Sequence, residues 1–222
     1  MQFPQQRGGA IVACAKDGQS GTDTYRQQRT DSCILLLNPT SGQQDAIADL
    51  MDYLPNGFKL NIIDSPSSPT PIFYLALKGG NYDVGSFNSP TSTGIQQITT
   101  VGFQPVLVML ATQGQAASNS IGSGAEIAFG AATSPTEKGF IWFEDPDNQR
   151  PSDNAMEIGA DRIIQWRNRT LSNSFAVRGS ADFVSFLSNG FKLQWSNVES
   201  QAKQIIYVAF GGNNYELDLE AQ

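Results

Sequence analysis

The chain has 222 residues, a formal net charge of −7, no histidine and two cysteines. Without histidine, the chain has no Ser-His-Asp or Cys-His nucleophile and no zinc site that uses imidazole. Its negative charge and lack of clustered Lys and Arg argue against nucleic acid as a partner and against insertion into an anionic membrane. No window approaches the roughly 18 apolar residues of a membrane span, and the first residues lack the apolar core of a signal peptide. We therefore expect synthesis in a cytoplasm, without a signal peptide, a transmembrane segment or a cofactor.

An internal repeat with an offset of 133 residues organises the chain. Ala48–Tyr82 aligns with Ala181–Tyr215 without a gap, and 15 of the 35 aligned positions are identical. The clearest block is Asn56–Leu60 (NGFKL), which recurs as Asn189–Leu193. We call the two parts copy one and copy two. Such a repeat indicates one supersecondary unit that is used twice.

The first predicted strands of copy one lie in the apolar runs Ile11–Ala15 and Cys33–Leu37. Each run contains one of the two cysteines, Cys14 and Cys33. Two cysteines are too few for a disulfide framework. We expect two buried thiols, and a disulfide between neighbouring strands is the alternative.

The next element, Gln44–Leu54, has a helical pattern when it is considered alone. Its repeat partner, Ala181–Leu187, is rich in residues that favour strands. Because both copies should adopt one structure, we predict a strand for both segments.

A hairpin and a central strand follow in each copy. Asn-Gly favours positive φ and predicts a tight hairpin turn before the next strand. In copy two, Phe191, Leu193 and Trp195 alternate with polar residues, which is the pattern of a half-buried strand. Ile205–Phe210 is apolar on both faces and predicts a central strand that is covered on both sides.

The composition of Gly85–Gly94 is typical of a domain linker. We therefore predict two tandem antiparallel β-sandwich domains, covering residues 1–88 and 89–222. Copy two begins with two predicted strands, Gly94–Thr100 and Gly102–Leu110, that have no counterpart in copy one. The first sandwich is thus predicted to be incomplete.

An incomplete sandwich exposes a strand edge and an apolar gap. We expect another segment or a second subunit to fill this gap by strand addition. A candidate donor is the strand predicted for Tyr215–Glu220, with Leu217 and Leu219 facing inwards as assembly residues.

Acidic side chains cluster after a predicted strand of copy two, at Glu144, Asp145, Asp147 and Asn148. Clustered oxygens of this kind suit calcium. The spacing does not match an EF-hand loop, and we favour a solvated turn in which Asp and Asn occupy turn positions. No catalytic residue and no further metal ligand is predicted.

Three runs carry a resemblance to known families, namely GFQPVLVML (102–110), SNGFKLQW (188–195) and IIYVAFGG (205–212). Their order resembles a repeat of tailed-phage virion proteins and is similar to H-type lectin domains. The resemblance implies small β-sandwiches that assemble as trimers. It also makes Trp195 a candidate for stacking on a sugar, although copy one has an aliphatic residue at this position, which favours a core role.

The sequence and the resemblance together lead to a functional expectation. We expect a non-enzymatic structural protein of a tailed-phage virion, made in the host cytoplasm. It would decorate or cement the head or contribute to the tail, as a homo-oligomer, with a trimer favoured, in contact with the major capsid or a tail protein. The alternative is a lectin-like module that recognises a surface glycan on the receptor, and a glycan hydrolase is the enzymatic option that we disfavour.

Overall fold

The computed structural model describes residues 8–16, 18–77, 79–116, 119–150, 153–169 and 175–212. These residues form sixteen strands and no helix, so the prediction of an all-β protein is confirmed. Within these ranges, no helix has the length and apolar character needed to span a membrane.

Copy one contributes six strands to the structure. They are β1 (Ala10–Ala15), β2 (Thr24–Arg29), β3 (Ile34–Leu37), β4 (Gln44–Leu54), β5 (Gly57–Asp64) and β6 (Asn81–Asn88). The segment that resembles a helix, β4, is a strand, as its repeat partner indicated. The order β3-β4-β5 forms one sheet, and β1-β2 belongs to another.

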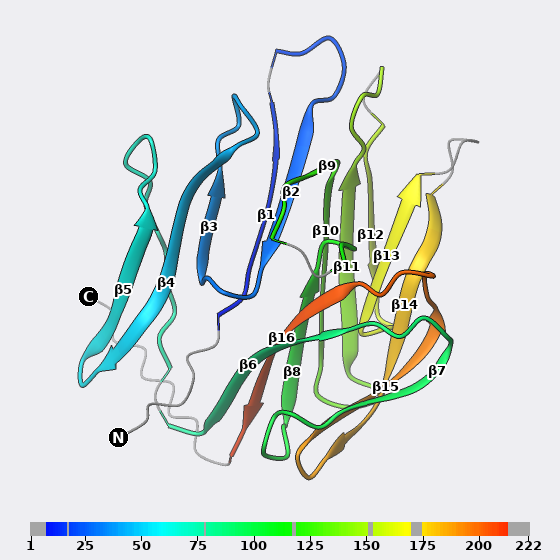
Figure 1. The fold of residues 1–222 in the computed structure, drawn as a ribbon. Coiled ribbons are helices and arrows are strands. Elements are labelled where there is room, and N and C mark those ends of the chain that lie inside the picture. The colour runs from blue at the N-terminus through cyan, green and yellow to red at the C-terminus, as the bar shows by residue number, and fades with distance from the viewer. Residues whose placement is uncertain are drawn as a thin grey trace.

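Copy two contributes the remaining strands. They are β7 (Gly94–Ile98), β8 (Leu107–Thr112), β9 (Gly122–Ser123), β10 (Ala125–Ala132), β11 (Lys138–Asp145), β12 (Ala155–Gly159), β13 (Ile164–Arg169), β14 (Phe175–Leu187), β15 (Gly190–Asn197) and β16 (Gln204–Gly211). A six-stranded sheet has the order β12-β11-β10-β8-β16-β6, and a four-stranded sheet has the order β13-β14-β15-β7 (Figure 1). The short strand β9 pairs with the edge of β2.

The two larger sheets enclose one apolar core, which is the arrangement of a β-sandwich. Val108 and Tyr207 come from the six-stranded sheet, and Leu193 and Trp195 come from the four-stranded sheet. All four side chains are buried because the alternation of each strand turns them towards the opposite sheet.

The internal repeat is confirmed at the level of strand register. In the β4–β5 hairpin, Ala48 lies opposite Ile62, and in the β14–β15 hairpin, 133 residues later, Ala181 lies opposite Trp195. Both hairpins have two register shifts, and these also fall at matching positions. A β-bulge locally bends and twists the strand, so matching bulges give both hairpins the same course.

The equivalence extends to the first hairpin, with an offset of 130 residues. Cys14 pairs with Tyr25 between β1 and β2, and Glu144 pairs with Ala155 between β11 and β12. Strands β1–β5 therefore correspond in order to β11–β15. Among the described residues, copy one has no counterpart of β7, β8 or β10, so the prediction of two missing strands was too low by one.

The predicted linker Gly85–Gly94 is wrong in its first part, because Gly85–Asn88 belong to β6. This strand pairs with β16 from Asn81 opposite Gly211 to Asn88 opposite Gln204. A strand at the end of the sequence of copy one thus forms the edge of the sheet of copy two. Gly85 is needed there because a Cβ would lie 2.5 Å from the Tyr207 hydroxyl.

The predicted Asn-Gly turns also differ from expectation. The hairpin loops consist of Pro55-Asn56 and Ser188-Asn189, while Gly57 and Gly190 are the first residues of β5 and β15. Neither glycine has a positive φ. Gly190 instead provides space, because a Cβ there would lie 1.8 Å from the carbonyl oxygen of Ile98 in β7.

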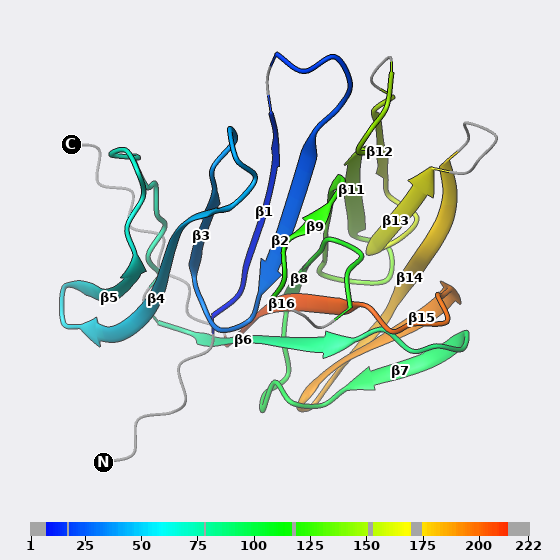
Figure 2. The same ribbon diagram turned by 45° about the horizontal axis from the view of Figure 1, so that its top comes forward.

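The β1–β2 hairpin joins the two copies. In both ribbon views it lies between β3–β5 and the sheets of copy two (Figures 1 and 2). The Gln28 side chain donates a hydrogen bond to the carbonyl oxygen of Gln204 and accepts one from the backbone of Gln113. These buried amides tie the hairpin to β16 and to the end of β8.

Candidate assembly surface

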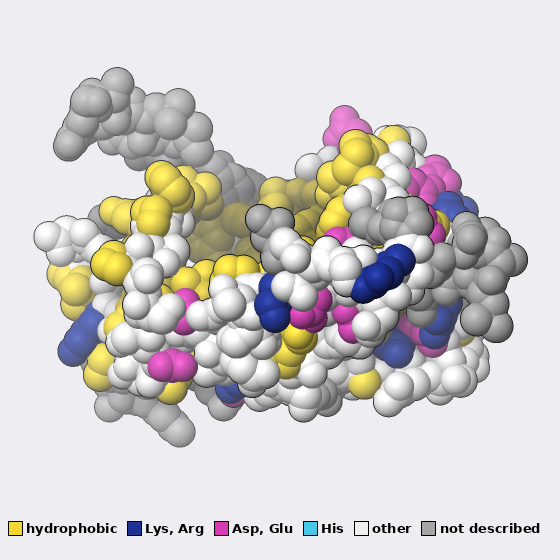
Figure 3. All heavy atoms as spheres, turned by 90° about the horizontal axis from the view of Figure 1, so that it is seen from above, with side chains coloured by type: hydrophobic (Ala, Val, Ile, Leu, Met, Phe, Trp, Pro, Cys, Tyr) yellow, Lys and Arg dark blue, Asp and Glu magenta, His cyan; other side chains and the backbone are white. Residues whose placement is uncertain are grey.

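A group of large apolar side chains lies exposed on copy one. They come from β4, β5 and the segment Pro71–Leu77, and we call them the open surface: Met51, Tyr53, Leu54, Ile62, Ile63, Ile72, Phe73, Tyr74, Leu75 and Leu77. Figure 3 shows hydrophobic side chains on the left of the molecule, the side on which Figure 1 places β4 and β5. A contiguous apolar surface of this kind typically marks an interaction site.

The repeat shows what these positions do when the sandwich is complete. Ile62 is 56% exposed, whereas its equivalent in copy two, Trp195, is fully buried. Tyr74 is 74% exposed, whereas its equivalent, Tyr207, is 1% exposed. The same sequence positions are therefore core in one copy and surface in the other.

The segment Pro71–Leu77 already has the placement of a sandwich strand. Its ring contact between Tyr74 and Phe58, at 5.1 Å and nearly perpendicular, repeats the contact between Tyr207 and Phe191 at 5.7 Å. However, the segment is not part of any ladder among the described residues, whereas its equivalent β16 pairs with both β6 and β8. Its backbone donors and acceptors are thus available to a further strand.

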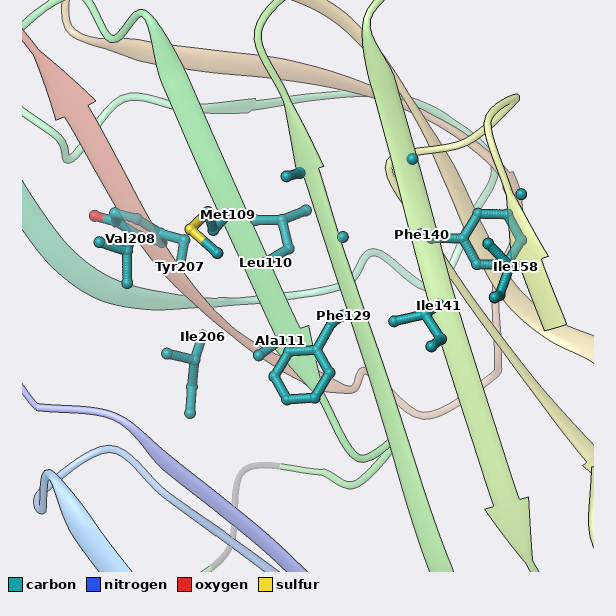
Figure 4. Close-up of a pocket in the computed structure, with 14 residues that line it drawn as sticks. Met109, Leu110, Ala111, Phe129, Phe140, Ile141, Ile158, Ile206, Tyr207 and Val208 are labelled. Atoms are coloured by element: carbon teal, nitrogen blue, oxygen red, sulfur yellow. The ribbon is translucent and has the colours of Figure 1, made fainter. Parts of the chain in front are cut away.

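A second apolar surface covers the outer face of the six-stranded sheet. A groove of about 500 Å³ runs across β16, β8, β10, β11 and β12 (Figure 4). Its lining includes Met109, Phe129, Ile141, Ile158 and Val208. The β1–β2 hairpin approaches one end of this face, where a Cβ on Gly9 would lie 2.5 Å from Ile206.

A buried ion pair connects copy one to copy two. Arg26 of β2 donates to a carboxylate oxygen of Glu126 of β10 at 2.6 Å, and the Trp142 indole approaches the other oxygen at 3.4 Å. Burial raises the pKa of Glu126 to about 8, with a smaller contribution from Glu144 on the neighbouring strand, while Arg26 acts in the opposite direction. Sequence reasoning missed this group, although a single acid inside the apolar run of β10 was a signal.

The raised pKa makes stability depend on pH. The Glu126 carboxyl titrates near 4.5 in the unfolded chain and near 8 in the fold, so the fold prefers the protonated form. The free energy of unfolding should be highest below pH 4.5 as far as this group is concerned, and should fall by a few kcal/mol as pH rises to 8. Urea titrations at several pH values measure this slope. Glu126→Gln, which has no proton to lose, should flatten the slope, and an unchanged slope would assign it to other groups.

The candidate calcium residues serve the turn and the core. A carboxylate oxygen of Asp147 accepts a hydrogen bond from the backbone of Thr24 at 3.1 Å, and Asn148 adopts the left-handed conformation with φ of 58°. Glu144 is buried on β11, and Asp145 accepts a hydrogen bond from Thr24 through its backbone oxygen. In the described ranges, no three His, Cys, Asp or Glu side chains gather to hold a metal ion.

The other predicted residues are placed as follows. Trp195 lies in the core, where its indole donates to Gln96 at 2.8 Å and packs against Trp166, so no face is open to a sugar. Cys14 and Cys33 are free thiols that are half-buried, and the alternative of a disulfide is wrong. The assembly candidates Leu217 and Leu219 lie outside the described residues.

Comparisons with known proteins found no match, whether to a family model, to a curated protein or to a solved structure.

Proposed function

We propose that this chain is a non-enzymatic structural subunit of a tailed-phage virion, in the head or the tail, and that it acts through protein–protein contacts. The observation that supports the proposal is the open surface of copy one, whose equivalents form the core of copy two. The phage setting rests on the resemblance of the sequence runs. No observation favours the lectin-like alternative to the same degree.

The proposed contact is the completion of copy one by strands of a neighbouring subunit. Partner strands would take the places that β7, β8 and β10 take in copy two. Each 100 Å² of apolar surface covered in this way contributes about 2.5 kcal/mol before the costs of association are subtracted. Main-chain pairing along the free edge of β5 would add directionality, as in other cases of strand addition.

Gly57 supports the same proposal. In copy two, Gly190 is required because the carbonyl oxygen of Ile98 in β7 lies against it. In copy one, no atom lies within 4 Å of a Cβ placed on Gly57, so the isolated chain has no steric need for this glycine. A partner strand at the position of β7 would create that need.

The proposed assembly is a homotrimer, and sedimentation velocity tests it. The purified chain should sediment as a trimer at high concentration. Ile62→Asp places a charge in the proposed contact and should give monomers, because an unpaired buried carboxylate is strongly unfavourable. Thr93→Asp, at an exposed turn between β6 and β7, serves as the control and should remain trimeric. A wild-type chain that stays monomeric at every concentration would contradict the proposal.

A further inference from the structure

The ladder between β6 and β16 stops where the described chain stops, and its register indicates how it continues. Residue pairs run from Asn88 opposite Gln204 to Asn81 opposite Gly211. In an antiparallel pair, each step back along one strand is a step forward along the other. The next positions in this register bring residues 213–222 alongside Pro71–Leu77. We propose that residues 213–222 pair with Pro71–Leu77 of the same chain and form its missing edge strand.

The geometry at the end of β16 supports a continuous crossing. A Cβ placed on Gly212 would lie 3.3 Å from the Cα atom of Gly80, so the two backbones are in contact there. Gly79, Gly80 and Gly212 all have positive φ, which glycine adopts at little cost. Both strands can therefore bend at the same point, one towards copy two and the other towards copy one.

The repeat independently assigns the two segments to each other. With the offset of 133, Pro71–Leu77 corresponds to the beginning of β16, and Asn214-Tyr215-Glu216-Leu217 corresponds to Asn81-Tyr82-Asp83-Val84 of β6. Because β6 pairs with β16, exchanging the copies pairs residues 214–221 with Pro71–Leu77. The two copies would then exchange their last strands reciprocally.

Side-chain chemistry agrees with this assignment at three positions. The Tyr207 hydroxyl donates to the carboxylate of Asp83 at 2.6 Å, and the matching pair is Tyr74 with Glu216. The same register places Leu217 opposite Leu75 and Leu219 opposite Phe73, which gives two apolar cross-strand pairs on one face. The pattern departs at Asp218, which stands where β6 has Gly85, so the Tyr74 ring must lie further out than that of Tyr207.

This inference goes beyond the proposed function and does not depend on it. Strand exchange would pair one edge of Pro71–Leu77 within the chain. The other edge, equivalent to the side of β16 that pairs with β8, would remain for a partner subunit. A monomeric chain could therefore have the exchanged strand, and a trimer could form without it.

Thiol cross-linking tests the pairing in the full-length chain. Leu75→Cys/Leu217→Cys and, as a second pair, Phe73→Cys/Leu219→Cys are made with Cys14 and Cys33 replaced by serine. A bifunctional thiol reagent that spans about 5 Å, the distance between opposed Cβ atoms, is added at low protein concentration. We expect most of each variant to become cross-linked within one chain, as shown by mass spectrometry of the proteolytic fragments.

The matched control is Leu75→Cys/Glu216→Cys, in which the second thiol points to the opposite face. It should cross-link at least tenfold more slowly. Three outcomes would overturn the proposal: no cross-link in either pair, equal rates in the control, or cross-links that join two chains. Sedimentation of the same wild-type protein reports separately on the proposed trimer.

Discussion

Replacing Gly190 by alanine is expected to destabilise the fold by about 3 kcal/mol or more, because the added methyl group would overlap the backbone of β7. The Cβ would lie 1.8 Å from the carbonyl oxygen of Ile98 and 3.2 Å from the Cα atom of Thr99. Both contacts are to backbone, so no side-chain rotation can relieve them. Either β7 separates from β15 or the hairpin shifts, and both cost hydrogen bonds between the strands. Guanidinium unfolding, followed by tryptophan fluorescence, measures the loss.

Gly57→Ala is the matched control, because it makes the same change at the equivalent position of copy one. Nothing lies within 4 Å of the added methyl group, and the φ of Gly57 is not positive. We expect the free energy of unfolding of the monomer to change by less than about 0.5 kcal/mol. Equal losses in the two variants would show that the hairpin itself needs the glycine, and the argument from β7 would then be wrong.

Tyr207→Ala is expected to cost about 3 to 5 kcal/mol, the range for truncating a buried aromatic side chain. Tyr207 is almost fully buried, its ring packs against Phe191 and its hydroxyl donates to Asp83. The variant therefore leaves a cavity and also removes the hydrogen bond to a carboxylate. Thermal and chemical denaturation of the variant and the wild type measure the difference.

Tyr74→Ala changes the same residue type at the same repeat position. The Tyr74 ring is mostly exposed and has an edge contact with Phe58, so the loss should be about 1 kcal/mol or less. A loss as large as that for Tyr207→Ala would contradict the view that this surface is open in the isolated chain. In the trimer, by contrast, Tyr74→Ala should weaken association.

Much of the architecture follows from the sequence because the repeat supplies a second view of each element. Gln44–Leu54 has a helical pattern, and only its partner in copy two indicates the strand that the structure shows. The alternation of Phe191, Leu193 and Trp195 correctly indicates one buried face. These features are local, so pattern and propensity are enough to predict them.

The features that the sequence did not reveal depend on contacts between distant segments. Gly85 was assigned to a linker because glycine and serine are common in linkers, but its role is to make room for the Tyr207 ring. Gly190 was assigned to a turn with positive φ, although it provides room for β7. The ion pair of Arg26 with Glu126 joins residues that are 100 positions apart, and no local pattern links them.

Residue-resolved hydrogen exchange of β5, in the monomer and in the assembly, tests the central claim most directly. In copy two, Phe191–Trp195 pair with β7, so the corresponding edge amides should exchange slowly in both states. The equivalent edge amides of Phe58–Ile62 should exchange rapidly in the monomer and at least a hundredfold more slowly in the assembly. Equally rapid exchange in both states would show that no strand completes copy one there, and the proposed role of the open surface would be wrong.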